Sequence, residues 1–258
     1  MQLRRLGGML LALNVGLSLS FFIDSSTALA TIPSLAPKVL VTNVFNQDRS
    51  LDSTGREYAD DLFWWINEGD MKIQNKMGHV QADKFRALAQ YEIKDNQNYL
   101  AQVYFKYNNY NGNGGTDSIG FLYNYHDGEN KYSTGIRADG YSEIKEKNDG
   151  KYSDNHNPKR VYLANENDGE SSSNNEIPSK RWIGLKIVVS QDHGYNNIKM
   201  YIDKGSGWTY ITEWTDDENL MNGGLIGLRT DGYDVEFRDF KVMDVGGNVL
   251  SPLNNTRI

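Results

Sequence analysis

The sequence predicts an all-β protein, a two-sheet antiparallel β-sandwich, and three observations predict it. Apolar side chains recur with a period of two rather than 3.6 along most of the chain. Clusters of Asn, Asp and Gly separate these stretches at the intervals expected of hairpin turns. Asn (27 residues) and Gly (25) make up a fifth of the 258 residues, beside 16 Tyr and only 5 Pro. This composition combines turn-forming residues with aromatic residues that favour strands.

Residues 1–30 have the parts of a secretory signal peptide. Arg4 and Arg5 supply the positively charged start, residues 6–23 form an apolar stretch, and Ala28 and Ala30 stand where a signal peptidase reads small residues. We expect cleavage after Ala30 and export to the cell exterior or cell surface. The alternative is a retained membrane anchor, for which an apolar stretch of this length is short.

The expected organisation is a signal peptide (1–30), a lead-in (31–42), one β-sandwich domain (43–246) and a C-terminal tail (247–258). Cleavage leaves 228 residues with 25 basic and 33 acidic side chains, a net charge of −8. An acidic chain is a poor partner for nucleic acid, because Lys and Arg supply that affinity by neutralising phosphates. The absence of Cys excludes disulfides, zinc fingers and thiol nucleophiles.

Seven stretches of the mature chain show the alternation of a half-buried strand. In 99–107, Val103 and Phe105 fall on one face and Gln102 and Tyr104 on the other. The other stretches are 119–125, 182–189, 198–203, 208–214, 225–230 and 235–242. Asp-Gly and Asn-Gly pairs between them predict hairpins. One short helix is expected within 52–63, after Asp52 or Ser53 as its cap.

Three segments, in this order, resemble the concanavalin A-like lectin/glucanase superfamily, in particular secreted laminin-G-like jelly rolls. They are residues 67–80 (NEGDMKIQNKMGHV), residues 118–147 (SIGFLYNYHDGENKYSTGIRADGYSEIKEK) and a closing part made of RWIGLKIVVS, IKMYID and GGLIGLRTDGYDVEFRDFKV. The first segment departs from the family pattern, because Met71 stands where a Trp is usual. The resemblance implies a jelly roll of two curved sheets, often with a carbohydrate on the concave one. It does not fix function, because the superfamily includes lectins, hydrolases, lyases and structural modules.

Binding of a polysaccharide or cell-surface glycan needs flat aromatic faces and polar groups that satisfy hydroxyls. Trp208, Tyr210 and Trp214 share a face of 208–214, which either packs inward or forms an exposed platform. The predicted carbohydrate-binding residues are Tyr107, Tyr110, Tyr123, Tyr132, Trp208 and Trp214. The leading hypothesis is therefore a secreted glycan-binding or adhesion module that uses aromatic stacking and hydrogen bonds. A structural protein of the cell envelope without a ligand is a further alternative.

The rival hypothesis is a secreted polysaccharide-degrading enzyme. A lyase needs a Tyr or His to remove a proton, with Arg, Gln or Asn neutralising the adjacent carboxylate. The candidates are Gln102, Tyr104, Tyr125, His126 and Arg137. A glycoside hydrolase needs two facing carboxylates, and the nearest run, Glu213 to Glu218, has the wrong spacing. Convergence of the lyase candidates in one groove would favour the enzyme.

A structural Ca²⁺ is the only cofactor that we expect. Calcium takes six to eight oxygen ligands from carboxylates, amides and carbonyl groups. Asp48 near the first strand, with Asp239 and Asp244 in the last, resembles the terminal clip of related sandwiches. Most other Asp and Asn residues of the glycine-containing loops are interpreted as turn formers.

Overall fold

The computed structural model describes residues 37–42, 44–52, 64–112, 117–153, 159–161, 180–192, 194–218 and 221–246. All of these belong to one compact unit, Leu35–Ile258. Within them every regular element is a β-strand, as the sequence predicts. The expected helix lies outside the described residues apart from Asp52, which ends a strand. The signal peptide, the first six residues of the lead-in and the C-terminal tail lie outside them as well, so these boundaries remain predictions.

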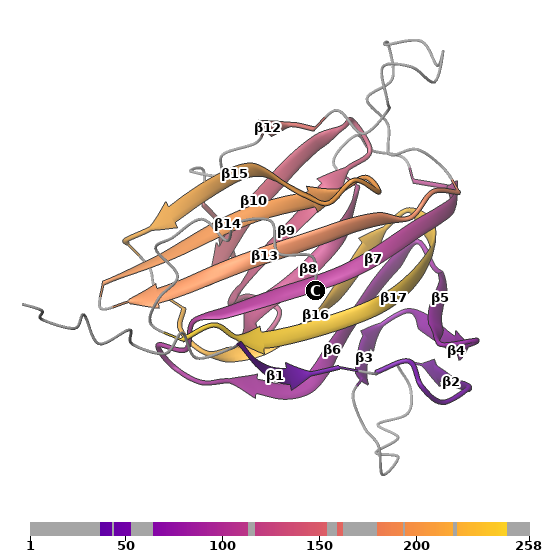
Figure 1. Cartoon of the computed structure of the whole chain (residues 1–258), viewed down its shortest axis with the longest axis horizontal. Coiled ribbons are helices and arrows are strands. Elements are labelled where there is room, and N and C mark those ends of the chain that lie inside the picture. Colours follow the sequence, from indigo (N-terminus) through magenta and orange to yellow (C-terminus); the bar gives the residue numbers. More distant parts are fainter. Residues whose placement is uncertain are drawn as a thin grey trace, which may run out of the picture. The chain divides into compact units, whose positions relative to one another are not determined.

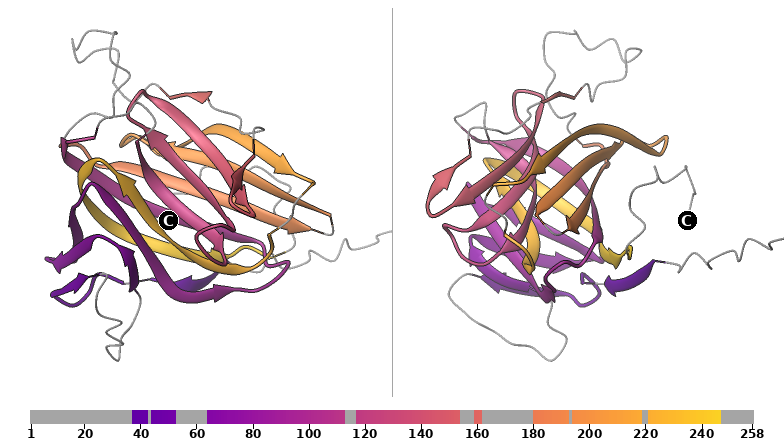
Figure 2. Two further views of the ribbon diagram at one scale, coloured as in Figure 1. Left: turned by 180° about the vertical axis from the view of Figure 1, so that it is seen from behind. Right: turned by 90° about the vertical axis from the view of Figure 1, so that its left-hand side faces the viewer.

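Seventeen strands among the described residues form two antiparallel sheets, which are stacked face to face (Figures 1 and 2). Sheet A contains, in spatial order, β15 (Trp208–Asp216), β14 (Tyr195–Asp203), β13 (Ile183–Asp192), β7 (Tyr99–Tyr110), β17 (Tyr233–Asp244), β5 (Met77–Gln81), β4 (Asp70–Gln74) and β2 (Arg49–Asp52), with β1 (Lys38–Val41) paired to β17. Sheet B contains β11 (Lys151–Tyr152), β10 (Tyr141–Asn148), β9 (Lys131–Arg137), β8 (Ser118–Tyr125), β16 (Gly224–Asp231), β6 (Lys84–Ile93) and β3 (Trp64–Glu68), with β12 (Lys159–Arg160) paired to β10. The predicted two-sheet antiparallel sandwich is confirmed.

The hydrophobic core lies between the two sheets and follows the predicted alternation. Along β7, Ala101, Val103 and Phe105 are fully buried, whereas Gln102 and Tyr104 point to the outer face of sheet A. From sheet B, Phe121 packs against Phe240 of sheet A with ring centroids 6.3 Å apart. Burial of a large side chain of this kind stabilises the fold by about 2–3 kcal/mol relative to exposure.

An irregularity in β15 changes which side chains face the core. Thr212 pairs with Met200 and Tyr210 pairs with Tyr201, so Ile211 is an extra residue. Such a bulge reverses the alternation on either side of it. Trp214 therefore faces inward, whereas Trp208 and Tyr210 lie on the outer face of sheet A. The prediction that Trp208 and Trp214 share a face is wrong.

No helix in the part of the chain that the structure describes has the length and apolarity needed to cross a membrane.

Candidate functional site

Four aromatic side chains and one lysine form a cluster on the outer face of sheet A, here called the aromatic platform. The register of the strands places them side by side: Trp208 of β15 pairs with Asp203 of β14, and Gly184 of β13 pairs with both Asp203 and Tyr104 of β7. In the adjacent row, Tyr210 and Tyr201 pair with each other, and Lys186 lies opposite Tyr201. The platform consists of Tyr104, Tyr201, Trp208, Tyr210 and Lys186.

Gly184 allows the rings of Tyr104 and Trp208 to approach each other. Their centroids are 5.7 Å apart with an interplanar angle of 50°. A Cβ atom at Gly184 would come within 2.9 Å of Cβ of Asp203 and of ring atoms of Tyr104 and Trp208. A larger residue at this position would therefore displace the rings, because side chains in a strand interior have little room to yield.

Lys186 is held among aromatic rings. Its Nζ lies 4.6 Å from the ring centroid of Tyr201 and 4.6 Å from that of Trp208, within the range of cation–π attraction. The side chain is almost completely buried, and burial lowers the pKa of Lys186 to about 8, although the charge of Asp203 opposes this shift. The lysine fixes the spacing of the two rings and keeps a positive charge beneath the platform.

Asp203 anchors the turn that carries Trp208. Its Oδ1 accepts hydrogen bonds from the backbone N–H groups of Gly205 (2.7 Å) and Gly207 (2.9 Å), and its Oδ2 accepts one from the Tyr104 hydroxyl (2.9 Å). Burial alone would raise the pKa of Asp203, but these donors outweigh it and lower the pKa. Burial and this same hydrogen bond raise the pKa of Tyr104 to about 12. The turn and the platform are thus linked by one ionised carboxylate.

The cluster continues across sheet A beyond Tyr104. The Arg238 guanidinium carbon lies 5.7 Å from the Tyr104 ring centroid and 4.1 Å from that of Trp182. Next to it, a groove of about 630 Å³ runs between β7, β17 and the segment after β1. Gln102, Tyr104, Asp239 and Lys241 are among the residues that line this groove. Its volume is within the range of ligand sites, and Tyr104 forms a wall of both the groove and the platform.

The other predicted carbohydrate-binding residues do not join the platform. Tyr123 and Tyr132 are fully buried and stack on each other at 5.7 Å, because both face the interior of the sandwich. These two predictions are wrong, since neither ring is accessible to a ligand. Tyr107 and Tyr110 are half-buried against Tyr233. Of the six residues predicted, only Trp208 belongs to the platform.

The five lyase candidates do not converge. Gln102 and Tyr104 lie on the outer face of sheet A, whereas Arg137 lies on the outer face of sheet B, beside Asp139 and Glu143. Tyr125 is also on the outer face of sheet B, in a small apolar cluster with Leu88 and Leu122, and His126 is exposed in the turn that follows. Because the five candidates are divided between the two sheets, the prediction that they form one catalytic site is wrong.

The predicted calcium clip is not formed by its three aspartates. Oδ1 of Asp48 accepts a hydrogen bond from the backbone N–H of Asn75, and Asp244 accepts hydrogen bonds from Gln97 and Gly246. Asp239 has its carboxylate 3.5 Å from Arg238. Among the described residues, no group of three or more His, Asp or Glu side chains is placed to hold one metal ion. The prediction that these three aspartates form one calcium site is therefore wrong. That the protein binds a structural Ca²⁺ remains a prediction.

Lys186 and Tyr201 are not among the binding residues that the sequence predicts. Both lie at outward positions of the alternating stretches 182–189 and 198–203, where their chain neighbours Ile187 and Met200 point into the core. The sequence feature that points to Lys186 is a single cationic residue in an otherwise apolar stretch. Their proximity to Trp208 depends on pairing between strands, which the sequence does not show.

No family model and no curated protein matches the sequence. Solved structures do match the fold. The carbohydrate-binding module CBM66 from Bacillus subtilis superposes with a TM-score of 0.51 at 11% identity, over 71% of this chain and 96% of that module. The exoplasmic/lumenal domain of VIP36, in a form bound to Ca²⁺ and Man3GlcNAc, superposes with a TM-score of 0.51 at 11% identity, over 80% of this chain and 90% of that domain.

A third similar structure is the GH43 protein BlXynB from Bacillus licheniformis, with a TM-score of 0.49 at 11% identity, over 79% of this chain and 39% of that protein. The first two superpositions agree with the fold described above: the chain is a jelly-roll β-sandwich of the concanavalin A-like type, as its sequence predicts. At these identities the likeness concerns the fold alone.

Proposed function

We propose that the protein is a secreted glycan-binding module that recognises a polysaccharide or a cell-surface glycan on the outer face of sheet A. The observation that carries the proposal is the aromatic platform, where half-exposed rings lie beside buried charged groups. Tyr210 is 47% exposed, and its ring meets Tyr201 edge to face at 5.8 Å. Sugar rings present apolar C–H faces that stack on such aromatic surfaces.

The polar groups around the platform match the needs of sugar hydroxyls. The exposed edge of the cluster offers Arg238 as a donor and the Gln102 amide as both donor and acceptor. Because charges of both signs lie close together, this surface suits an uncharged sugar better than a polyanion. The adjoining groove would extend the contact along a chain of several sugars. One of the similar structures is named as a carbohydrate-binding module and another is a form bound to Man3GlcNAc, which supports the proposal at the level of fold only.

Secretion rests on the signal-peptide pattern of residues 1–30. The polysaccharide-degrading enzyme is not favoured by any specific contact among its predicted residues, which lie on different sheets.

A glycan array probed with the full chain tests the proposal. We expect binding to at least one neutral glycan, and at least a tenfold loss of affinity in Trp208→Ala, because removal of a central aromatic contact at a binding surface has effects of this size. The matched control is Trp65→Ala, which makes the same change on the outer face of sheet B. Failure to bind any glycan, or a loss confined to Trp65→Ala, contradicts the proposal.

A further inference from the structure

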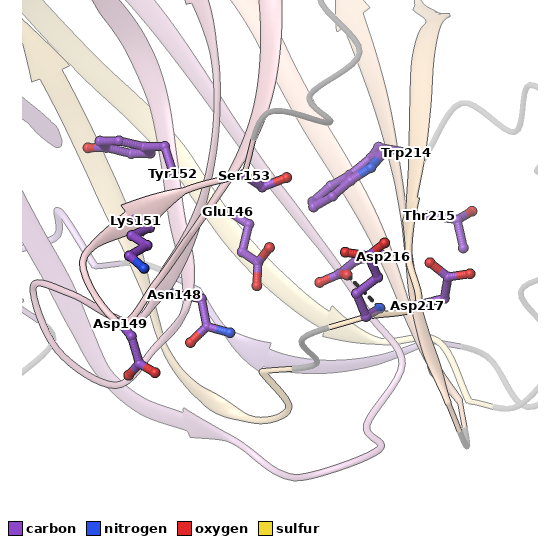
Figure 3. A pocket seen from close by; sticks show the side chains of 11 residues that line it. Glu146, Asn148, Asp149, Lys151, Tyr152, Ser153, Trp214, Thr215, Asp216 and Asp217 are labelled. Atoms are coloured by element: carbon purple, nitrogen blue, oxygen red, sulfur yellow. Dashed lines mark hydrogen bonds between the residues drawn. The ribbon is translucent and has the colours of Figure 1, made fainter.

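A second pocket opens between the edges of the two sheets (Figure 3). None of the residues that line it belongs to the aromatic platform. Strands β10 and β11 of sheet B form one side, and the end of β15 in sheet A forms the other. Its volume is about 440 Å³, which is within the range of ligand sites. Acidic groups predominate among the charged residues that line it, which are Glu146, Asp149, Lys151, Asp216, Asp217 and Glu218.

Glu146 is the central group of this pocket. It faces inward from β10, its side chain is 3% exposed, and Figure 3 shows the carboxyl group directed into the pocket. The Asn148 side chain hydrogen-bonds the carboxyl group, but Oε1 has no hydrogen-bond partner among the described residues. A buried acceptor without a donor is costly. A ligand that brings a donor to Oε1 would remove this cost.

Asp216 supplies a second, firmly held carboxylate on the opposite side. It accepts hydrogen bonds from the Tyr132 hydroxyl and from the backbone N–H of Glu218 (3.2 Å). The Tyr132 oxygen in turn accepts a hydrogen bond from Nδ2 of Asn196 (3.1 Å). Burial and the charge of Asp216 raise the pKa of Glu146 to about 7, with Glu218 adding to the shift. The pocket therefore favours a positive charge near Glu146.

Two aromatic side chains flank the carboxyl group. Trp214 is half-buried, packs against Tyr132 at 6.0 Å and lines the pocket from β15. Tyr152 lines it from β11 and is 59% exposed. Figure 3 shows these rings on opposite sides of Glu146. A flat-faced ligand that also carries a cation fits this combination better than a simple ion does.

We propose that this pocket binds an unacetylated amino sugar, whose protonated primary amine donates hydrogen bonds to Glu146 and Asp216 while its ring lies against Trp214. The inference goes beyond the proposed site, because this pocket is separate from the aromatic platform, and it rests only on the proposal that the protein binds glycans. An ammonium group has three donors that reach separate acceptors, which suits carboxylates arranged around a pocket. Among the described residues, no three carboxylates are placed as ligands of one metal ion.

Binding couples to the protonation of Glu146. An ammonium ligand pairs with the ionised carboxylate, so at or below neutral pH the carboxyl group releases its proton to solvent as the ligand binds. The affinity for the amine therefore falls as the pH falls below about 7. The titratable groups facing Glu146 are Tyr132 from β9, Asp149, Lys151 and Tyr152 from the β10–β11 hairpin, and Asp216, Asp217 and Glu218 from the end of β15 and beyond.

The test compares the glucosamine tetramer with its fully N-acetylated counterpart in direct binding measurements on the full chain at pH 7. We expect the amine form to bind at least tenfold more tightly, because hydrogen bonds to charged groups are the stronger class. Glu146→Gln keeps the shape and removes the charge, and should bring the two affinities within about twofold of each other. Glu213→Gln, the same change on the outward face of β15, should leave the selectivity intact.

Equal affinity for the two tetramers, or selectivity that survives Glu146→Gln, overturns the proposal. Glu218→Gln is a second variant at an exposed position and should reduce selectivity by a smaller factor, about twofold to fivefold. Failure of this inference is distinguishable from failure of the proposed function. Trp208→Ala removes binding at the aromatic platform and leaves the amine selectivity of the pocket unchanged. Glu146→Gln removes the amine selectivity and leaves the binding of a neutral glycan at the platform unchanged.

Discussion

The Glu146→Gln substitution should make the protein more stable at alkaline pH. In the folded chain, burial and the charge of Asp216 raise the pKa of Glu146 from 4.5 to about 7. In the unfolded chain this carboxyl group loses its proton at its ordinary pKa. Between these two values the folded state binds more protons than the unfolded state, so the free energy of unfolding falls as the pH rises.

The magnitude follows from the size of the shift. One pKa unit corresponds to about 1.4 kcal/mol, so a shift from 4.5 to about 7 corresponds to at most about 3.5 kcal/mol above pH 7. Glutamine cannot ionise and avoids this loss. The free energy of unfolding of Glu146→Gln should therefore match that of the parent protein near pH 4 and exceed it by up to about 3.5 kcal/mol at pH 8.5.

Urea unfolding followed by tryptophan fluorescence measures this difference at intervals from pH 4 to pH 8.5. Glu213→Gln serves as the control, because it removes a carboxylate that is about half exposed, and its stability difference should stay within about 0.5 kcal/mol throughout. The reasoning is refuted if the difference between Glu146→Gln and the parent protein does not depend on pH, or if it increases toward acid.

Other substitutions test the remaining structural claims. Gly184→Ala should displace the rings of Tyr104 and Trp208, lowering glycan affinity and costing about 1–3 kcal/mol of stability, which binding titration and urea unfolding measure together. Tyr132→Phe removes the hydroxyl that donates to Asp216 and should cost about 1–3 kcal/mol; an unchanged melting temperature would contradict the buried network. Phe121→Ala should cost about 3–5 kcal/mol, visible as a fall in melting temperature of about 2–4 °C per kcal/mol, and a fall of less than 3 °C would place this ring outside the core.

The sequence was sufficient to predict the seven alternating stretches, because apolar side chains facing the core must alternate, whereas a strand such as β6 (Lys84–Ile93) was not among them. The positions of Val103, Phe105 and Tyr104 along β7 follow from that rule alone. The rule fails where one residue is inserted. Ile211 lies at a bulge in β15, and nothing in its side chain distinguishes it from a regular strand residue, so the face of Trp214 could not be predicted.

The candidate sites depend on pairings that one sequence does not contain. Tyr123 and Tyr132 look like binding residues until their strands are placed in sheet B, where both rings turn inward. Glu146 and Asp216 are 70 positions apart and come from different sheets, and only the stacking of those sheets brings them into one pocket. The sequence therefore predicted the fold, whereas the residues that gather at each surface depend on strand pairing and sheet stacking.

The most direct test of the proposed glycan site is the response of the tryptophan indole N–H signals to a bound glycan. The chain has five Trp residues, so a ¹⁵N-labelled sample gives five such signals in a ¹H–¹⁵N spectrum. On titration with a neutral glycan that the array identifies, we predict that the Trp208 signal shifts most, while the signal of Trp65 on the outer face of sheet B stays in place. A shift of the Trp65 signal with an unchanged Trp208 signal would contradict the account.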